Sequence, residues 1–225
     1  MAENIAYNID CMEYMRTLPD KAFDLAIVDP IYGAVKCGYS HDSQSTSRLA
    51  HAKKYHEEIW QQPKTGKDYF DELFRISKNQ IIWGGNFFCE EIRRNSPCWL
   101  VWDKVNGTNQ YADCELAWTS FPGAVRRFQY RWAGMLQENM KNKEARIHPT
   151  QKPVALYTWL MQLFAKPGDR IIDTHLGSGS SRIAAHELGI DFVGCEISET
   201  YFRLQNERYE KHIAQGSLFK ESNDG

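Results

Sequence analysis

An acid, a proline and an aromatic residue follow directly on an apolar run near the start of the chain. Residues 25–28 read Leu-Ala-Ile-Val and predict a buried parallel strand, which Pro30 and Gly33 then end. Asp29 and Tyr32 are therefore expected at the carboxyl end of a strand, where open α/β sheets bind ligands. A carboxylate there can accept the hydrogens of an amino group while the aromatic ring stacks on the flat ring that bears it. An ordinary Asp-Pro turn is the alternative for this segment alone.

A second apolar run, residues 170–173, leads into a loop of small residues and then into a helical pattern. Gly177 and Gly179 in this loop have no Cβ, so the backbone can approach a ligand closely. A helix that begins near Ser180 would present free N–H groups and the positive end of its dipole to the loop. Glu196 ends a third strand about twenty residues after the loop, which is the usual place for an acid that holds ribose hydroxyls.

The elements that must position these residues alternate between strand and helix. This alternation predicts a doubly wound, mostly parallel, Rossmann-like sheet, and a chain of 225 residues is long enough for a single domain with a substantial core. The last residues, 217–225, are expected to fray. Strands are expected at 5–9, 23–29, 80–83, 99–102, 115–119, 170–173 and 192–195, and helices at 12–18, 67–76, 87–94, 154–165, 180–188 and 199–213.

The composition is that of an ordinary globular protein, with 42% hydrophobic residues. The chain has no N-terminal signal sequence and no apolar run long enough to span a membrane, so we expect a cytoplasmic protein. Its six cysteines show no zinc-ligand spacing, and no pair of histidines completes such a pattern. We therefore expect no metal site and no disulfides.

The net charge of −2 conceals two basic segments on an acidic body. Residues 34–68 are polar, weakly patterned and net positive, and they predict a long, mobile loop with some helix around 50–59. Loops of this length are usually functional. Residues 121–147 combine six Lys or Arg with two Glu and several aromatic residues. Basic segments of this kind suggest local contact with a polyanion, although solvated loops have the same composition.

Taken together, these segments resemble the amino-methylating DNA methyltransferases, which act on N6 of adenine or N4 of cytosine. Residues 29–32, Asp-Pro-Ile-Tyr, are similar to the family's catalytic Asp-Pro-Pro-Tyr, and residues 173–181 are similar to its cofactor loop. The order of catalytic motif, recognition segment and cofactor loop is the permuted arrangement called the β class. The resemblance covers roughly residues 4–213 and extends to the segments 84–86, 102–104, 114–116 and 148–153.

The resemblance implies S-adenosylmethionine as methyl donor and double-stranded DNA as substrate. Asp29 and the Pro30 carbonyl would hold the target amino group, and Tyr32 would stack on a base flipped out of the duplex. The cofactor would be bound by Asp10, Asp29, Lys152, Asp173, His175, Gly177, Ser178, Gly179 and Glu196. DNA would be contacted by the 121–147 segment, with help from the 34–68 loop, through Arg126, Arg127, Arg131, Lys141, Lys143 and Arg146.

Two positions depart from the family pattern, because Ile31 replaces the second proline and Thr174-His175 replace Pro-Phe. An acid at position 29 favours adenine, whereas cytosine-N4 enzymes more often have Ser there. The alternatives are a cytosine-N4 enzyme and a catalytically inactive DNA-binding relative. Enzymes that methylate RNA or protein glutamine usually have Asn in place of Asp29. The glycine loop lacks the third glycine of NAD-binding folds and the Gly-Lys-Ser/Thr of P-loops.

The resemblance leaves further partners open. A homodimer and a companion restriction endonuclease are both compatible with the family, and the short recognition segment favours a short or relaxed target sequence. The protein would then be nucleoid-associated in a bacterium or encoded by a phage. All of these expectations require that the two motifs, far apart in the chain, meet at one edge of one sheet.

Overall fold

One eight-stranded sheet runs through the structure, a computed structural model that describes residues 2–33, 63–107, 112–133 and 136–221. Its strand order is β1-β10-β9-β2-β3-β5-β4-β6, and a separate antiparallel pair consists of β7 and β8. The strands are β1 (Asn4–Asn8), β2 (Phe23–Val28), β3 (Ser77–Trp83), β4 (Leu100–Asp103), β5 (Cys114–Thr119), β6 (Arg126–Gln129), β7 (Trp132–Ala133), β8 (Leu136–Gln137), β9 (Arg170–Asp173) and β10 (Asp191–Glu196).

Five neighbouring strands of this sheet, β1, β10, β9, β2 and β3, are parallel. Beyond β3 the direction changes, because β5 is antiparallel to both β3 and β4, and β6 pairs with β4 in parallel. The sheet is therefore mostly parallel, and the expected doubly wound, Rossmann-like class is confirmed.

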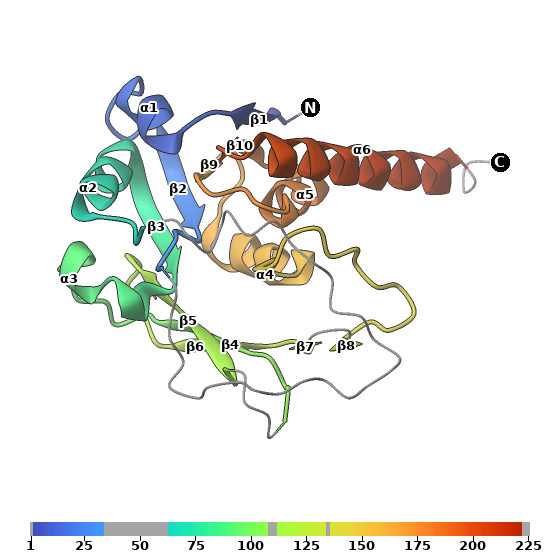
Figure 1. Cartoon of the computed structure of the whole chain (residues 1–225), viewed down its shortest axis with the longest axis horizontal. Helices are drawn as coiled ribbons and strands as arrows, with labels where there is room; N and C mark the ends of the chain where they lie inside the picture. Colours follow the sequence, from blue (N-terminus) through green and yellow to red (C-terminus); the bar gives the residue numbers. More distant parts are fainter. Residues whose placement is uncertain (1, 34–62, 108–111, 134–135, 222–225) are drawn as a thin grey trace.

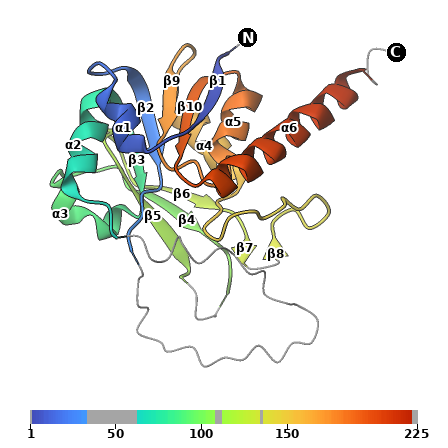
Figure 2. The ribbon, with the colours of Figure 1, turned by 45° about the horizontal axis from the view of Figure 1, so that its top comes forward.

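Helices cover both faces of the sheet (Figure 1). One face packs against α1, α2 and α3, and the other packs against α4 and α5, so the sheet separates two hydrophobic cores. In both views α6 extends away from the body of the molecule toward the C-terminus (Figures 1 and 2). The helices are α1 (Cys11–Arg16), α2 (Lys67–Ile76), α3 (Cys89–Ile92), α4 (Val154–Phe164), α5 (Ser180–Leu188) and α6 (Glu199–Glu221), and a 3-10 turn, η2, spans Gly85–Phe87.

The central strand β2 shows why an uninterrupted apolar run forms a strand here. Its side chains alternate between the two cores, with Leu25 and Ile27 in one and Ala26 and Val28 in the other. All four are at most 1% exposed. A parallel strand covered by helices on both faces needs apolar residues at every position, which explains the absence of a polar alternation.

The winding of the sheet reverses between β2 and β9, which are direct neighbours through Leu25 and Ile171. The chain passes from β2 through α2 to β3 on one side, and from β9 through α5 to β10 on the other side. A crevice at the carboxyl ends of the strands is expected at such a switch point. The sheet order thus brings the ends of β1, β10, β9, β2 and β3 to one edge.

Some elements differ from those expected. Helix α6 continues to Glu221, where fraying was expected from residue 217. The helix expected at 87–94 is only the short η2 and α3, and the 121–147 segment contains three short strands, β6 to β8. The helix expected around 50–59 lies outside the described residues. Within the described parts of the chain, no helix has the length and apolarity needed to cross a membrane.

Candidate functional site

A cavity of about 650 Å³ opens at the carboxyl edge of the sheet, where β2 and β9 lie side by side. Volumes in this range suit a small organic ligand. Its walls come from the ends of β1, β2, β9 and β10, from the chain that leads into α2, and from residues around 148–152. Of the sequence-predicted residues, the walls include Asp10, Asp29, Pro30, Tyr32, Lys152, His175, Gly177, Ser178 and Glu196.

Residues 29–32, the predicted catalytic segment, follow β2 and place Tyr32 against the turn after β3. The ring of Tyr32 stacks on Phe87 of η2, with 4.7 Å between the centroids and 16° between the planes. Gly84 lies at the edge of the Tyr32 ring, and a Cβ at that position would be 2.9 Å from Tyr32 Cδ1. Because Tyr32 lines the cavity, Phe87 and Gly84 support a ring that faces the ligand space.

A chain of four charged side chains runs inward from Asp29. Asp29 forms a hydrogen-bonded ion pair with Lys152, whose side chain is only 3% exposed. Lys152 Nζ also lies 3.1 Å from Glu115 Oε2, and Lys104 Nζ lies 2.5 Å from Glu115 Oε1. Two positive and two negative groups therefore alternate, so that each carboxylate has an ammonium partner.

The second oxygen of Asp29 has a different environment. Asp29 Oδ1 is buried and has no hydrogen-bond partner among the described residues. Burial raises the pKa of Asp29 above its ordinary value, against the attraction of Lys152. Lys152 and Lys104 hold the pKa of Glu115 down at about 2 in spite of its burial. An oxygen that lacks a partner at a cavity wall is suited to accept a hydrogen bond from a ligand.

The loop after β9 forms the opposite wall of the cavity. Gly177 has φ +51°, and a Cβ there would be 3.6 Å from the ring of His148. Its N–H donates to Glu196 Oε2 at 2.8 Å, while Ser198 N–H donates to Glu196 Oε1 at 2.9 Å. Both oxygens of this acid are thus oriented by backbone donors, and each keeps a lone pair for a further hydrogen bond.

Asp10 lies at the end of β1 and also lines the cavity. Its Oδ1 accepts the N–H of Met12 at 2.7 Å and caps α1. Because β1 pairs with β10, Asp10, two residues beyond the end of β1, and Glu196, the last residue of β10, lie at the ends of adjacent strands. Two acids on adjacent strand ends are placed to receive the hydroxyl and amino hydrogens of one elongated ligand.

Two predicted cofactor residues are placed behind the wall. Asp173 and Gly179 are not among the described residues that line the cavity. Asp173 is 2% exposed, and its oxygens accept the N–H of His175 at 3.0 Å and the hydroxyl of Ser181 at 2.5 Å. The Asp173 carboxylate thus holds the loop and the start of α5 together, and its expected contact with the cofactor stays a prediction. Gly179, at φ +72°, is the N-cap residue of α5.

His175 occupies the position where the family pattern has Phe. It lines the cavity, its Nδ1 lies 3.0 Å from Thr174 Oγ1, and its ring meets that of Tyr69 edge-on at 5.2 Å. Burial lowers its pKa to about 4, so the imidazole is neutral at neutral pH. Burial also lowers the pKa of His148 to about 4.

The predicted DNA-contacting residues lie apart from the cavity, since none of the six is among its described lining residues. Arg126 and Arg127 are exposed on the edge strand β6. Arg131, Lys141 and Lys143 are exposed as well. Arg146 is half-buried, donates to the Pro149 carbonyl at 3.3 Å and lies over the Trp132 ring. Arg146 therefore packs within the protein in this structure.

Sequence reasoning assigned no role to Lys104, Glu115, Phe87 or His148. The first two were visible as parts of segments that fit the family, but their meeting depends on the register of β4 and β5, which pairs Trp102 with Glu115. The sequence does predict two consecutive strands, at 99–102 and 115–119, and pairing them as a hairpin would have brought Lys104 and Glu115 near each other. The stacking of Phe87 on Tyr32 depends on the positive φ of Gly84. The residue pattern around Gly84 did not predict this contact.

Known proteins are similar to this chain in sequence and in fold. The profile of the DNA methylase family matches residues 34–207. The chain is 35% identical over 151 residues to the type II methyltransferase M2.DpnII of Streptococcus pneumoniae, a match that covers 67% of this chain and 49% of that protein. The chain thus spans about half the length of this relative.

Solved structures share the fold at low identity. The chain is similar to M1.HpyAVI in complex with S-adenosylmethionine, with a TM-score of 0.56 and 17% identity over 92% of this chain and 100% of the other. It is also similar to the PvuII DNA methyltransferase, described as cytosine-N4-specific, with a TM-score of 0.58 and 12% identity over 95% of this chain and 92% of the other. The family resemblance seen in the sequence is confirmed, and with it S-adenosylmethionine as the family's cofactor.

Proposed function

Since the chain belongs to the DNA methylase family, we propose that it transfers a methyl group from S-adenosylmethionine to N6 of adenine in duplex DNA. The observation that supports this proposal most directly is the unpartnered Asp29 Oδ1 beside Tyr32, in the same cavity as Gly177 and Glu196. An amine acceptor site and a cofactor site would then share one space. This is the arrangement that direct transfer between two bound molecules needs.

The residues of the cavity fit such a cofactor. Asp10 and Glu196 would accept hydrogen bonds from its adenine amino group and its ribose hydroxyls, and the backbone at Gly177 and Ser178 would border its methionine portion. When bound, S-adenosylmethionine supplies a methyl group that its sulfonium already activates. The neutral ring of His175 adds no positive charge beside a cationic cofactor.

Asp29 and Pro30 would act on the target amine. The adenine amino group would donate one hydrogen to Asp29 Oδ1 and the other to the Pro30 carbonyl. These two bonds would favour a pyramidal nitrogen whose lone pair points away from the ring. Methylation leaves a positive nitrogen, and its proton passes most directly to Asp29, whose pKa is raised by burial.

Tyr32 would stack on the base, which must leave the duplex to enter the cavity. Burial raises the pKa of Tyr32 to about 12, so its phenol is neutral. Phe87 stabilises the ring orientation through the stacking described above. We propose that the exposed Arg and Lys side chains of residues 121–147, together with the 34–68 loop, contact the duplex around the flipped base. A homodimer and a companion restriction endonuclease stay predictions.

The test is single-molecule sequencing of DNA from cells that express the chain, which reports the modified base and its sequence context together. We expect N6-methyladenine in a short motif. Modification of cytosine N4 would replace the adenine assignment, and unmodified DNA from cells with folded protein would contradict the proposal.

A substitution tests the catalytic acid. Asp29→Ala should lower the rate of methyl transfer at least about a thousandfold, because the amine loses its charged acceptor. Binding of S-adenosylhomocysteine, measured by calorimetry, should stay within about threefold of the wild type, a difference of less than 1 kcal/mol. Glu207→Ala, which removes an exposed acid paired with Arg203 on α6, is the matched control and should leave both quantities unchanged.

A further inference from the structure

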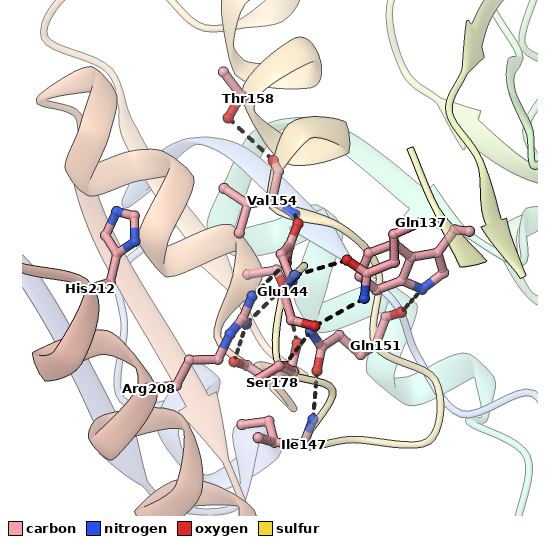
Figure 3. Close-up of polar contacts among 12 residues, drawn as sticks. Gln137, Glu144, Ile147, Gln151, Val154, Thr158, Ser178, Arg208 and His212 are labelled. Atoms are coloured by element: carbon pink, nitrogen blue, oxygen red, sulfur yellow. Dashed lines mark hydrogen bonds and ion pairs between the residues drawn. The ribbon is translucent and has the colours of Figure 1, made fainter. Parts of the chain in front are cut away.

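One partly buried ion pair joins the 121–147 segment to the loop after β9 (Figure 3). Glu144 Oε2 lies 2.7 Å from Arg208 Nη2 on α6, and the two side chains are 21% and 11% exposed. Nη1 of the same guanidinium donates to the Ser178 carbonyl at 2.7 Å and to Ser180 Oγ at 3.0 Å. A single side chain, Arg208, thus connects an acid of the basic segment with a backbone carbonyl of the loop that lines the cavity.

Glu144 forms three further hydrogen bonds, one with Val154 and two with Gln137. Its Oε1 accepts the N–H of Val154 at 3.0 Å and so caps the start of α4. Its backbone N–H donates to Gln137 Oε1 at 2.8 Å, and its carbonyl accepts from Gln137 Nε2 at 2.9 Å. The side chain of Gln137 therefore closes a loop whose exposed tip includes Lys141 and Lys143.

These contacts make independent movement of the two parts costly. A buried charge that loses its partner keeps the penalty of desolvation without the compensating attraction. If the loop that includes Lys141 and Lys143 shifts, Glu144 must take Arg208 with it or leave it unpaired. Arg208 in turn holds the Ser178 carbonyl, one residue from Gly177, whose N–H is bonded to Glu196.

We propose that Glu144 and Arg208 are positioning residues that couple DNA contact at the 121–147 segment to the shape of the cofactor loop. The inference rests on the proposed function, because it takes DNA as the ligand of that segment. Linkage then requires DNA to increase cofactor affinity by the same factor by which the cofactor increases DNA affinity. This factor depends on the ion pair.

The experiment measures S-adenosylhomocysteine binding by calorimetry with and without a short DNA duplex. This duplex contains the target sequence that the sequencing experiment identifies. For the wild type we expect the duplex to tighten binding by about fivefold or more. Glu144→Gln keeps one acceptor oxygen, enough for Val154, but it presents an amide NH₂ to Arg208. In this variant the factor by which the duplex tightens S-adenosylhomocysteine binding should fall to about one. The affinity for S-adenosylhomocysteine without DNA should change less than about twofold.

Arg208→Met removes the bond to Ser178 as well and should weaken S-adenosylhomocysteine binding without DNA by roughly tenfold. Arg203→Met is the matched control, since Arg203 lies on the same helix in an exposed pair with Glu207; it should behave as the wild type. Steady-state kinetics add a second measurement. Glu144→Gln should raise the KM for S-adenosylmethionine with little change in kcat, whereas partial unfolding would lower kcat.

Two results would overturn the inference. One is a folded Glu144→Gln protein that binds the duplex and keeps the wild-type factor. The other is an Arg208→Met protein whose affinity for S-adenosylhomocysteine is unchanged without DNA. Failure of the proposed function looks different, because it is the absence of any methylated site in the sequencing experiment.

Discussion

The ionisation state of a single residue, Asp29, decides whether the site can work as proposed. Burial favours the neutral acid, and the neighbouring Glu115 also disfavours a second negative charge, whereas Lys152 favours the carboxylate. Sequence analysis expected Lys152 at the cofactor. The structure places it on the cavity wall with its ammonium group between the two acids. Lys152 therefore sets the charge of the acceptor in addition to lining the cofactor space.

Opposite shifts of the pH profile follow from this arrangement. In the proposed mechanism, activity requires ionised Asp29, so the rate should fall as the pH drops through the pKa of this group. Lys152→Met removes the attraction that lowers this pKa, so the acidic limb of kcat/KM should move to higher pH. Glu115→Gln removes a repulsion that raises the pKa, so the limb should move to lower pH. Methyl transfer measured from pH 5 to 9 checks both; shifts of the same sign would show that Asp29 is not the titrating group.

The positions of acidic residues on the cavity wall were predictable where the side chain lies at the carboxyl end of its own strand. Asp29 and Asp10 follow a strand, Glu196 is the last residue of one, and each of the three lines the cavity. Asp173 also ends a strand, but its environment could not be foreseen, because Ser181 and His175 take both of its oxygens. Both partners lie close to Asp173 in the chain, but their donors reach its oxygens only through the conformation of the loop between β9 and α5, which the residue pattern does not specify.

At the scale of elements, the turn after β3 determines where Tyr32 can lie. Gly84 has φ +66° and Gly85 begins η2. A Cβ on Gly85 would come within 2.5 Å of Trp118 Cβ and 2.8 Å of Trp118 N, so this glycine allows the turn to pack on β5. A Cβ on Gly84 would instead meet the Tyr32 ring. Gly85 thus allows the turn to pack on β5, whereas Gly84 leaves room for the Tyr32 ring in the cavity wall.

Gly84→Ala should lower kcat/KM by at least about tenfold, because the new methyl group displaces Tyr32 from its stacked position. The left-handed conformation alone should cost about 1 kcal/mol of unfolding free energy. Gly168→Ala is the matched control: its φ is +86°, but nothing among the described residues lies within 4 Å of its Cβ position. This control should lose similar stability and keep full activity. Equal kinetic effects of both substitutions would contradict a role for Gly84 in placing Tyr32.

Helices and strands were predicted correctly where the hydrophobic periodicity and the end signals of the segment agreed. Helix α2 has the expected bounds, Lys67–Ile76, because an apolar face and a well-defined end agree. The strands of the 121–147 segment were not foreseen. β6 has an exposed, basic pattern and pairs in parallel with β4 through a long-range contact, Leu100 with Arg126. Such edge strands are defined by their neighbour in space and not by their own hydrophobicity.

For the whole molecule, the separation of charge predicts how DNA binding responds to salt. The net charge is −2, so attraction to DNA must come from exposed local groups such as Lys141 and Lys143. Replacing both by Ala should weaken binding uniformly across sequences and reduce the slope of log K against log salt by about 2. Fluorescence anisotropy at several salt concentrations measures this slope. Lys211→Ala together with Lys166→Ala, outside the basic segments, should leave it unchanged.

Buried titratable groups on the cavity wall and behind it also make the stability of the whole protein depend on pH. His148 and His175 have pKa values lowered from 6.5 to about 4, so the unfolded chain binds more protons below pH 6.5. Their contribution to stability is present above pH 6.5 and is lost as the pH falls toward about 4. Asp173 acts in the opposite direction, because its pKa is raised from 3.8 to about 7. Its contribution is present below pH 3.8 and is lost as the pH rises toward about 7.

The two effects can be separated by urea unfolding at pH 6.5 and pH 5. Over this interval each group changes the free energy of unfolding by about 2 kcal/mol, at about 1.4 kcal/mol per pH unit. His175→Phe, which restores the family's usual residue, should therefore reduce the loss of stability on acidification by about 2 kcal/mol relative to the wild type. Asp173→Asn should increase that loss by a similar amount. If the three proteins lost the same stability, neither group would be buried in the state that the structure shows.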